Sequence, residues 1–150
     1  MKQTFSTSPD WTWDSTGAPL GNYLVHVWAV QVGDSTASYE AVGETGFTLT
    51  NPPPCATAGI GPLSPSQPAG SMVGFVATST GCQAPIYEYW YQNLAGTWKL
   101  GRPFSQDPSW SWDTTGPAPG TYNIHVWANQ QGHSTGSYEP YALATAILTS

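Results

Sequence analysis

Histidine and tryptophan recur together in this chain, two residues apart. His26 precedes Trp28 in GNYLVHVWAVQ (21–31), and His125 precedes Trp127 in the nearly identical GTYNIHVWANQ (120–130). An imidazole next to an indole is able to serve as a metal ligand or a general base. Both stretches hold the pair among the same neighbours, however, and catalysis rarely occurs in duplicate. We therefore interpret the two histidines as surface or packing residues.

Other arrangements that support catalysis are weak in this sequence. A serine hydrolase needs serine, histidine and an acid in a fixed geometry, and no G-x-S-x-G motif occurs. Asp113 is more consistent with a carboxylate that accepts N–H groups in its own turn than with a catalytic acid. Asp107, Asp113 and Glu139 make a weak case for calcium, which prefers several clustered carboxylates. We predict no enzyme, no cofactor and no metal site.

The two similar stretches belong to a long internal repeat. Residues 5–50 and 104–149 align without a gap at an offset of 99 and are identical at 23 of 46 positions. Residues 55–100 have no second copy. The simplest division is a tandem array, in which residues 55–150 form a complete unit and residues 1–50 form the back half of the preceding unit. Residues 51–70, rich in proline and glycine, are then a linker and the entry to the complete unit.

Composition narrows the possible partners. Only 8% of residues are charged, against ~25% in a typical globular chain, and the net charge is -6 with three basic residues. Such a chain has no electrostatic surface for nucleic acid or an anionic membrane. It has no apolar run of the ~20 residues that a membrane span needs. We predict no nucleic-acid partner and no membrane insertion.

Cys55 and Cys82 are spaced for a disulfide bond rather than for a four-ligand metal site. A small β domain rich in aromatic residues, serine, threonine and glycine, with two cysteines, is typical of extracellular proteins. We therefore predict a disulfide and a secreted or cell-surface location, with an export signal outside this chain. The alternative is a pair of reduced, buried thiols.

Alternating apolar residues predict strands throughout and no helix. The expected strands cover 71–80, 85–93, 96–101, 109–113, 121–130, 135–139 and 142–149. Alternation places one row of the fifth strand inward, namely Tyr122, Ile124, Val126 and Ala128. His125 and Trp127 then point outward. If Tyr87, Tyr89 and Tyr91 also point inward, Trp90 points outward.

The outward aromatic residues are the most interesting candidates for a binding surface. They are Trp90, Trp98, His125 and Trp127 in the complete unit, with His26 and Trp28 in the partial one. If their strands are neighbours, Trp90 and Trp127 form a cross-strand pair. Rings on a flat sheet face stack on sugar rings or bury the surface of a partner. The alternative, which remains open, is that a loop or the Trp98 hairpin covers them as a secondary packing cluster.

The order of these motifs resembles the second half of an immunoglobulin-like or fibronectin type III-like sandwich. The order is Trp-x-Trp-Asp, a Gly/Pro turn, then Pro-Gly-Thr-Tyr-x-Ile-x-Val-Trp-Ala. Tyr122, with Tyr23 in the partial unit, resembles the tyrosine corner of such folds. The chain looks like tandem modules of large secreted or surface proteins of bacteria. The resemblance implies an all-β antiparallel sandwich, with the disulfide joining the entry of the first strand to the end of the second.

These observations favour a non-catalytic structural or adhesive module. The partial unit lacks its front strands, so its inward row, Tyr23, Val25, Val27 and Ala29, would face water. One front half and two back halves always leave one back half without a partner. We therefore expect a homo-oligomer or a domain-swapped assembly formed by strand complementation. The alternative function is carbohydrate binding on the outward tryptophan face, with a glycan or another surface protein as partner.

Overall fold

The computed structural model describes residues 3–62 and 64–150 and shows an all-β protein. Contacts divide the chain into two compact units, Met1–Asn51 and Pro52–Ser150, which we call the N-terminal unit and the C-terminal unit. Among the described residues there is no helix, as the sequence predicts, and therefore none that is long and apolar enough to cross a membrane.

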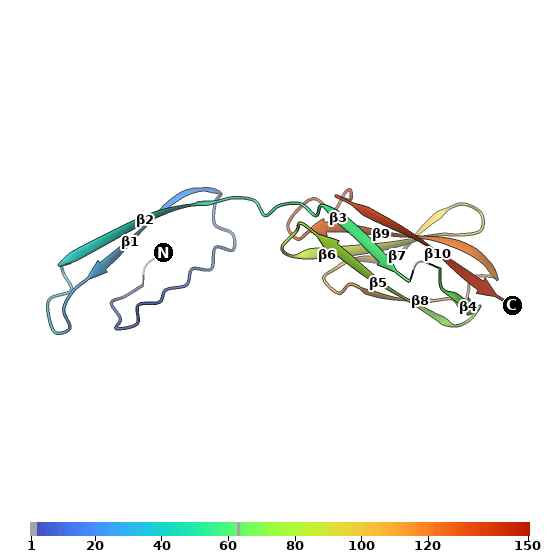
Figure 1. The fold of residues 1–150 in the computed structure, drawn as a ribbon, viewed down its shortest axis with the longest axis horizontal. Coiled ribbons are helices and arrows are strands. Elements are labelled where there is room, and N and C mark those ends of the chain that lie inside the picture. The colour runs from blue at the N-terminus through green and yellow to red at the C-terminus, as the bar shows by residue number, and fades with distance from the viewer. Residues whose placement is uncertain (1–2, 63) are drawn as a thin grey trace. The chain divides into compact units, whose positions relative to one another are not determined.

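The N-terminal unit is built on a single antiparallel hairpin, visible in Figure 1. Strand β1 (Gly21–Ala29) pairs with β2 (Ala41–Leu49) along its full length. The indole of Trp13 packs on the rings of Tyr23 and Phe47, with ring centroids 4.8 and 5.4 Å apart. This aromatic contact partly covers one end of the hairpin.

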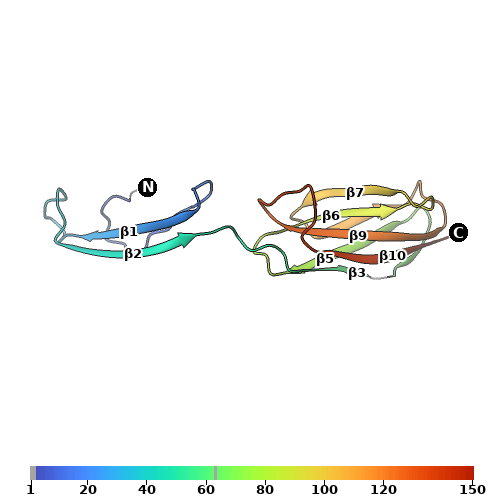
Figure 2. The same ribbon diagram turned by 90° about the horizontal axis from the view of Figure 1, so that it is seen from above.

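The C-terminal unit is a two-layered sandwich, and Figure 2 shows β3 and β5 in one layer and β6, β7 and β9 in the other. The first sheet has the order β3-β5-β8, formed by Thr57–Gly61, Met72–Thr80 and Ser109–Asp113. The second has the order β4-β10-β9-β6-β7, formed by Ser66–Pro68, Tyr141–Thr149, Gly120–Gln130, Pro85–Gln92 and Trp98–Ser105. All pairings are antiparallel except β4 with β10, which is parallel. The prediction of an all-β antiparallel sandwich is confirmed at this level, and the short parallel pairing of β4 with β10 is an addition to it.

Aromatic side chains from both sheets fill the core between them. The Trp110 ring of β8 packs against Tyr89 of β6, with centroids 5.3 Å apart. Trp112 of β8 packs against Tyr122 of β9 at 5.1 Å. These contacts join the two layers, and large aromatic rings supply the buried apolar area that the few leucines and isoleucines of the chain cannot.

The strand β9 shows the inward row that alternation predicts. Tyr122, Ile124, Val126 and Ala128 are at most 2% exposed. The same row has a different environment in the N-terminal unit. Val27 is 63% exposed and Ala29 is exposed, while Tyr23 and Val25 are only partly buried. One apolar pattern is therefore fully covered in one unit and largely open in the other.

The two tyrosines that begin these rows make the same local contact. The hydroxyl of Tyr122 donates a hydrogen bond to the carbonyl of Ala118 at 2.8 Å, and that of Tyr23 donates to the carbonyl of Pro19 at 2.5 Å. Each bond spans four residues and fixes the Gly/Pro turn before its strand. The turn and the start of the strand therefore form in both units, whether or not the second sheet is present.

The strand predicted at 135–139 was wrong, because side chains rather than a strand partner satisfy this segment. The Asn129 amide donates to the carbonyls of Ser134 and Ser137 at 2.7 Å each, and its oxygen accepts from the N–H of Glu139 at 3.0 Å. The region 51–70, expected as a linker and the entry to the complete unit, contains β3 and β4. The strand expected over 96–101 is found at Trp98–Ser105 as β7.

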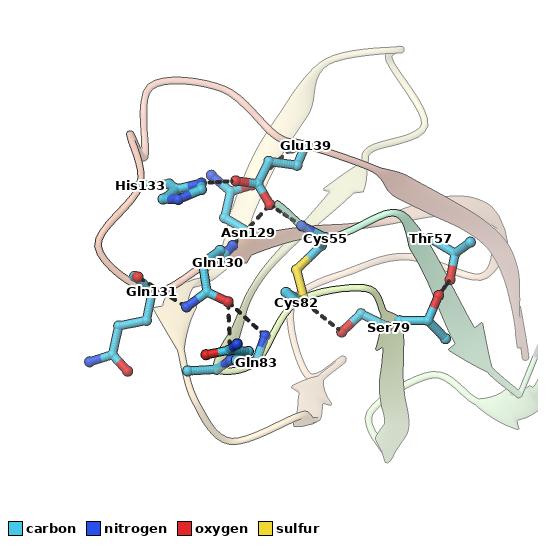
Figure 3. The surroundings of a disulfide bond; sticks show 12 residues. Cys55, Thr57, Ser79, Cys82, Gln83, Asn129, Gln130, Gln131, His133 and Glu139 are labelled. Carbon is cyan, nitrogen blue, oxygen red and sulfur yellow. Dashed lines mark hydrogen bonds and ion pairs between the residues drawn. A yellow bond between two sulfur atoms is a disulfide. The ribbon is translucent and has the colours of Figure 1, made fainter. Parts of the chain in front are cut away.

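The predicted disulfide between Cys55 and Cys82 is present. Cys55 precedes β3 and Cys82 follows β5, so the bond closes the open end of this antiparallel pair. In the chain-entropy model, a loop of 27 residues corresponds to about 3–4 kcal/mol of stabilisation. Figure 3 shows that the carboxylate of Glu139 lies beside this disulfide.

Glu139 joins the entry of the C-terminal unit to the loop between β9 and β10. Its Oε2 accepts hydrogen bonds from the N–H of Cys55 at 2.5 Å and of Gln130 at 3.0 Å, and its Oε1 lies 2.5 Å from Nδ1 of His133. Burial raises the pKa of this carboxyl, but the three hydrogen bonds outweigh burial. The pKa of Glu139 therefore lies below its ordinary value of 4.5.

Replacing this carboxylate tests its contribution to stability. We expect Glu139→Gln to lower the free energy of unfolding by about 1–3 kcal/mol, because an amide cannot accept all three hydrogen bonds. Since the pKa is lower in the folded state, the stabilisation is present above pH 4.5 and is lost as pH falls through the folded pKa. Urea unfolding at several pH values measures both effects.

Glu40 provides the matched control, because it occupies the equivalent repeat position and accepts from the N–H of Gln31 at 3.1 Å. Glu40→Gln should change the stability of the C-terminal unit little. A loss caused by Glu139→Gln that stays constant from pH 7 down to pH 3 would contradict the account.

Candidate aromatic binding surface

Strand pairing brings the outward-facing residues of three strands together on the outer face of the five-stranded sheet. In the pairing of β6 with β9, Trp90 lies opposite His125 and Glu88 lies opposite Trp127. In the pairing of β9 with β10, Tyr141 lies opposite Trp127. Because side chains alternate between the two faces of a strand, all five point away from the core.

Three of these outward side chains, together with one from β7, line one open, apolar pocket of about 300 Å³: Trp90, His125, Trp127 and Trp98. The rings of Trp90 and Trp127 lie diagonally across β6 and β9 with centroids 5.6 Å apart. Trp98, from the edge strand β7, leans across the sheet onto the His125 ring at 4.2 Å. We call this feature the aromatic pocket.

Two tyrosines extend the aromatic pocket beyond the residues that the sequence indicated. The Tyr138 ring packs against Trp127 at 5.0 Å, and the Tyr141 ring packs against His125 at 5.2 Å. Both tyrosines are more than 40% exposed. Tyr138 has a repeat partner in Tyr39, a signal that was available in the sequence. Tyr141 has none, since Val42 occupies its equivalent position, so only the register of β10 reveals it.

Polar groups lie in and around the pocket with unused hydrogen-bonding capacity. Within residues 3–62 and 64–150, no hydrogen bond reaches a ring nitrogen of His125, and the buried Nε1 of Trp127 also has no partner. The Nε1 of Trp90, by contrast, donates to Oε1 of Glu88 at 2.7 Å. Beside these rings, the Asn123 amide donates to Oε1 of Gln92 at 2.9 Å.

The surroundings of His125 favour the neutral form of its imidazole. Burial among the rings lowers the pKa of His125 below its ordinary value of 6.5, because the charged imidazolium loses hydration there. A neutral imidazole carries one N–H donor and one nitrogen acceptor. The pocket therefore offers both kinds of polar atom among apolar walls.

The corresponding residues of the N-terminal unit form only part of this arrangement. Trp28 packs against Tyr39 at 5.0 Å, which repeats the Trp127–Tyr138 contact. His26, however, has Nδ1 3.3 Å from Oε1 of Glu44, where the C-terminal unit has Leu143 in place of the glutamate. In the described part of the chain, β1 pairs only with β2. Nothing in this unit corresponds to Trp90 or Trp98.

The carboxylates that were candidates for catalysis or calcium binding have structural roles. Oδ1 of Asp113 accepts the N–H of Thr115 at 2.9 Å, and this hydrogen bond lowers the pKa of the Asp113 carboxyl. This confirms the predicted turn-capping role. No group of three or more histidine, cysteine, aspartate or glutamate residues is placed to hold a metal ion among the residues that the structure describes.

Comparisons with known proteins do not identify the chain. No protein-family model matches it, and no curated protein matches it significantly. The resemblance to immunoglobulin-like modules therefore stays a prediction, and functional inference rests on the geometry of the chain itself.

The packing around His125 predicts its titration. Nuclear magnetic resonance titration of the full chain should give a pKa for His125 below 6.5. Trp98→Ala should raise this pKa towards 6.5, because removing the stacked indole readmits water to the ring. A pKa at or above 6.5 in the unmodified chain would show that water hydrates the His125 ring and that the neighbouring rings do not bury it.

Proposed function

We propose that the chain is a non-catalytic structural or adhesive module of a secreted or cell-surface tandem-repeat protein, and that it self-associates through its N-terminal unit. The observation that carries this proposal is the row Tyr23, Val25, Val27 and Ala29. Its repeat equivalents are fully buried in the C-terminal unit, whereas Val27 is 63% exposed. Burying such side chains contributes roughly 1.5–3 kcal/mol each for the larger ones.

The topology of the C-terminal unit supports an immunoglobulin-like or fibronectin type III-like assignment. The chain crosses between its three-stranded and five-stranded sheets several times, at β3–β4, β4–β5, β5–β6, β7–β8 and β8–β9, as in Greek-key sandwiches. The Tyr122 hydroxyl bonds to a carbonyl four residues upstream, as in a tyrosine corner. The Cys55–Cys82 disulfide supports an oxidising, extracellular compartment.

The exposed row of the N-terminal unit favours pairing between two copies of this unit. Val27 is 63% exposed and Ala29 is exposed, and a second copy presents the same apolar row, which is able to cover them. The result is a two-fold homodimer, in which one surface meets its own copy.

Charge placed on the open row tests this proposal. Val27→Asp should weaken self-association at least tenfold, because the dimer would then bury an unpaired carboxylate. Leu24→Asp is the matched control, since Leu24 is 61% exposed on the opposite face and lies opposite a glycine, as Val27 does. Sedimentation equilibrium measures both. A monomeric wild-type chain at high micromolar concentration, or equal effects of the two variants, would contradict the proposal.

The aromatic pocket supports carbohydrate binding as a second function. Clustered aromatic side chains with convergent polar groups are typical of small-molecule sites. The four rings that line the pocket lie on strands rather than on loops, and Trp98 is 37% exposed. This function is compatible with the first, because self-association uses the N-terminal unit and the pocket lies in the C-terminal unit.

Repeat-equivalent tryptophans provide a matched test of this second function. Trp127→Ala should abolish binding of the full chain to a glycan array, because it removes one wall of the pocket. Trp28→Ala should leave binding unchanged, since its unit lacks Trp90 and Trp98. Thermal unfolding confirms that each variant is folded. Equal loss in both variants would show that glycan binding does not depend on the aromatic pocket.

A further inference from the structure

The aromatic pocket combines apolar indole rings with the polar ring nitrogens of a histidine. Trp90, Trp98 and Trp127 present apolar rings, whereas His125 presents ring nitrogens that accept or donate no hydrogen bond among the described residues. A wholly apolar occupant would remove these nitrogens from water without replacing their hydrogen bonds. Such a loss costs about 1–3 kcal/mol for each unsatisfied group.

A hydroxylated ring matches both kinds of surface. The C–H face of a pyranose is apolar and flat enough to lie against an indole, while its hydroxyl groups point outward around the rim. Each hydroxyl both donates and accepts, which suits a neutral imidazole with one donor and one acceptor. The amides of Asn123 and Gln92 lie in the neighbouring row of the same sheet and extend the polar rim.

Charge near the pocket selects against anionic sugars. The carboxylate of Glu88 is held at the pocket by the Trp90 indole. Arg102 is engaged by backbone carbonyls of Asp107 and Ser109 and by the Asp107 carboxylate. With a net charge of -6, the chain repels a polyanion at long range as well.

We propose that the aromatic pocket binds one ring of an uncharged pyranose chain, with Trp98 and Trp90 stacking on the sugar and His125 hydrogen-bonding its hydroxyl groups. This inference rests on carbohydrate binding as proposed above, and it names the ligand class, the orienting residue and the number of sites. The volume of about 300 Å³ is at the small end of ligand pockets, as expected for a single ring. The N-terminal unit lacks Trp90 and Trp98, so each chain has one site.

Calorimetric titration of the full chain tests the proposal with defined probes. The neutral probes are hexasaccharides of glucose, xylose, mannose and N-acetylglucosamine, and the anionic probe is polygalacturonate. We expect at least one neutral probe to bind with one site per chain, and polygalacturonate not to bind. Trp98→Ala and His125→Phe should each weaken binding at least tenfold, while Trp28→Ala leaves it unchanged.

The two substitutions report on different parts of the site. His125→Phe keeps a ring of similar shape and removes only the polar atoms, so it isolates the hydrogen bonds. Trp98 lies on an edge strand and is 37% exposed, so its loss leaves the core intact. Thermal unfolding checks both variants.

The outcomes separate this inference from the functions on which it rests. Neutral glycan binding that survives His125→Phe, shows two sites per chain, or is replaced by polygalacturonate binding overturns the inference but leaves carbohydrate binding standing. Failure of every neutral and anionic probe overturns both. If probes fail and Trp98→Ala instead dissociates the oligomer, the aromatic pocket is a contact between copies of the chain. None of these results alters the separate test of self-association by Val27→Asp.

Discussion

The inward row of β9 is stable because a second sheet covers it. Tyr122, Ile124 and Val126 lose nearly all contact with water against the rings of β8 and β5. The chain repeats this row in β1, but among the described residues the N-terminal unit has only the Trp13 segment to place over it. Apolar burial is the dominant stabilising term in folding. The C-terminal unit therefore buries its row within its own core, whereas the exposed row of the N-terminal unit remains free to pack against another surface.

The two packed sheets of the C-terminal unit form a rigid platform for the aromatic pocket. Disulfide, Glu139 and Asn129 fix the end of the sandwich where β3 enters and the β9–β10 loop turns back. On the outer face, the register of β6 with β9 sets Trp90 beside His125. The aromatic pocket is therefore positioned by strands rather than by loops, which favours a preformed site.

Much of this arrangement was predictable from alternation and repetition. The inward row of β9, the outward position of Trp90 and Trp127, and the absence of helix all follow from a period of two. The Asx role of Asp113 and the Cys55–Cys82 bond also follow from local spacing. The strand expected at 135–139 does not form, because the Asn129 side chain bonds the carbonyls of this loop in place of a neighbouring strand, and residue alternation carries no signal of such a contact. Likewise, the Trp98 ring reaches His125 because β7 lies at the edge of the sheet, two strands from β9. The residues of one strand do not show which strands lie beside it in the sheet.

Hydrogen exchange measured by mass spectrometry compares the two rows most directly, using peptides that cover β1 and β9 in the same full-length chain. Among the described residues, β1 pairs with β2 alone, so every second N–H of β1 lies on an open edge, whereas β9 lies between β10 and β6. At low protein concentration, our account predicts exchange in β1 that is orders of magnitude faster than in β9. Protection of β1 should then rise with protein concentration, because the exposed apolar rows of two copies of the chain pack against each other. Equal, slow exchange of both strands at every concentration would contradict it.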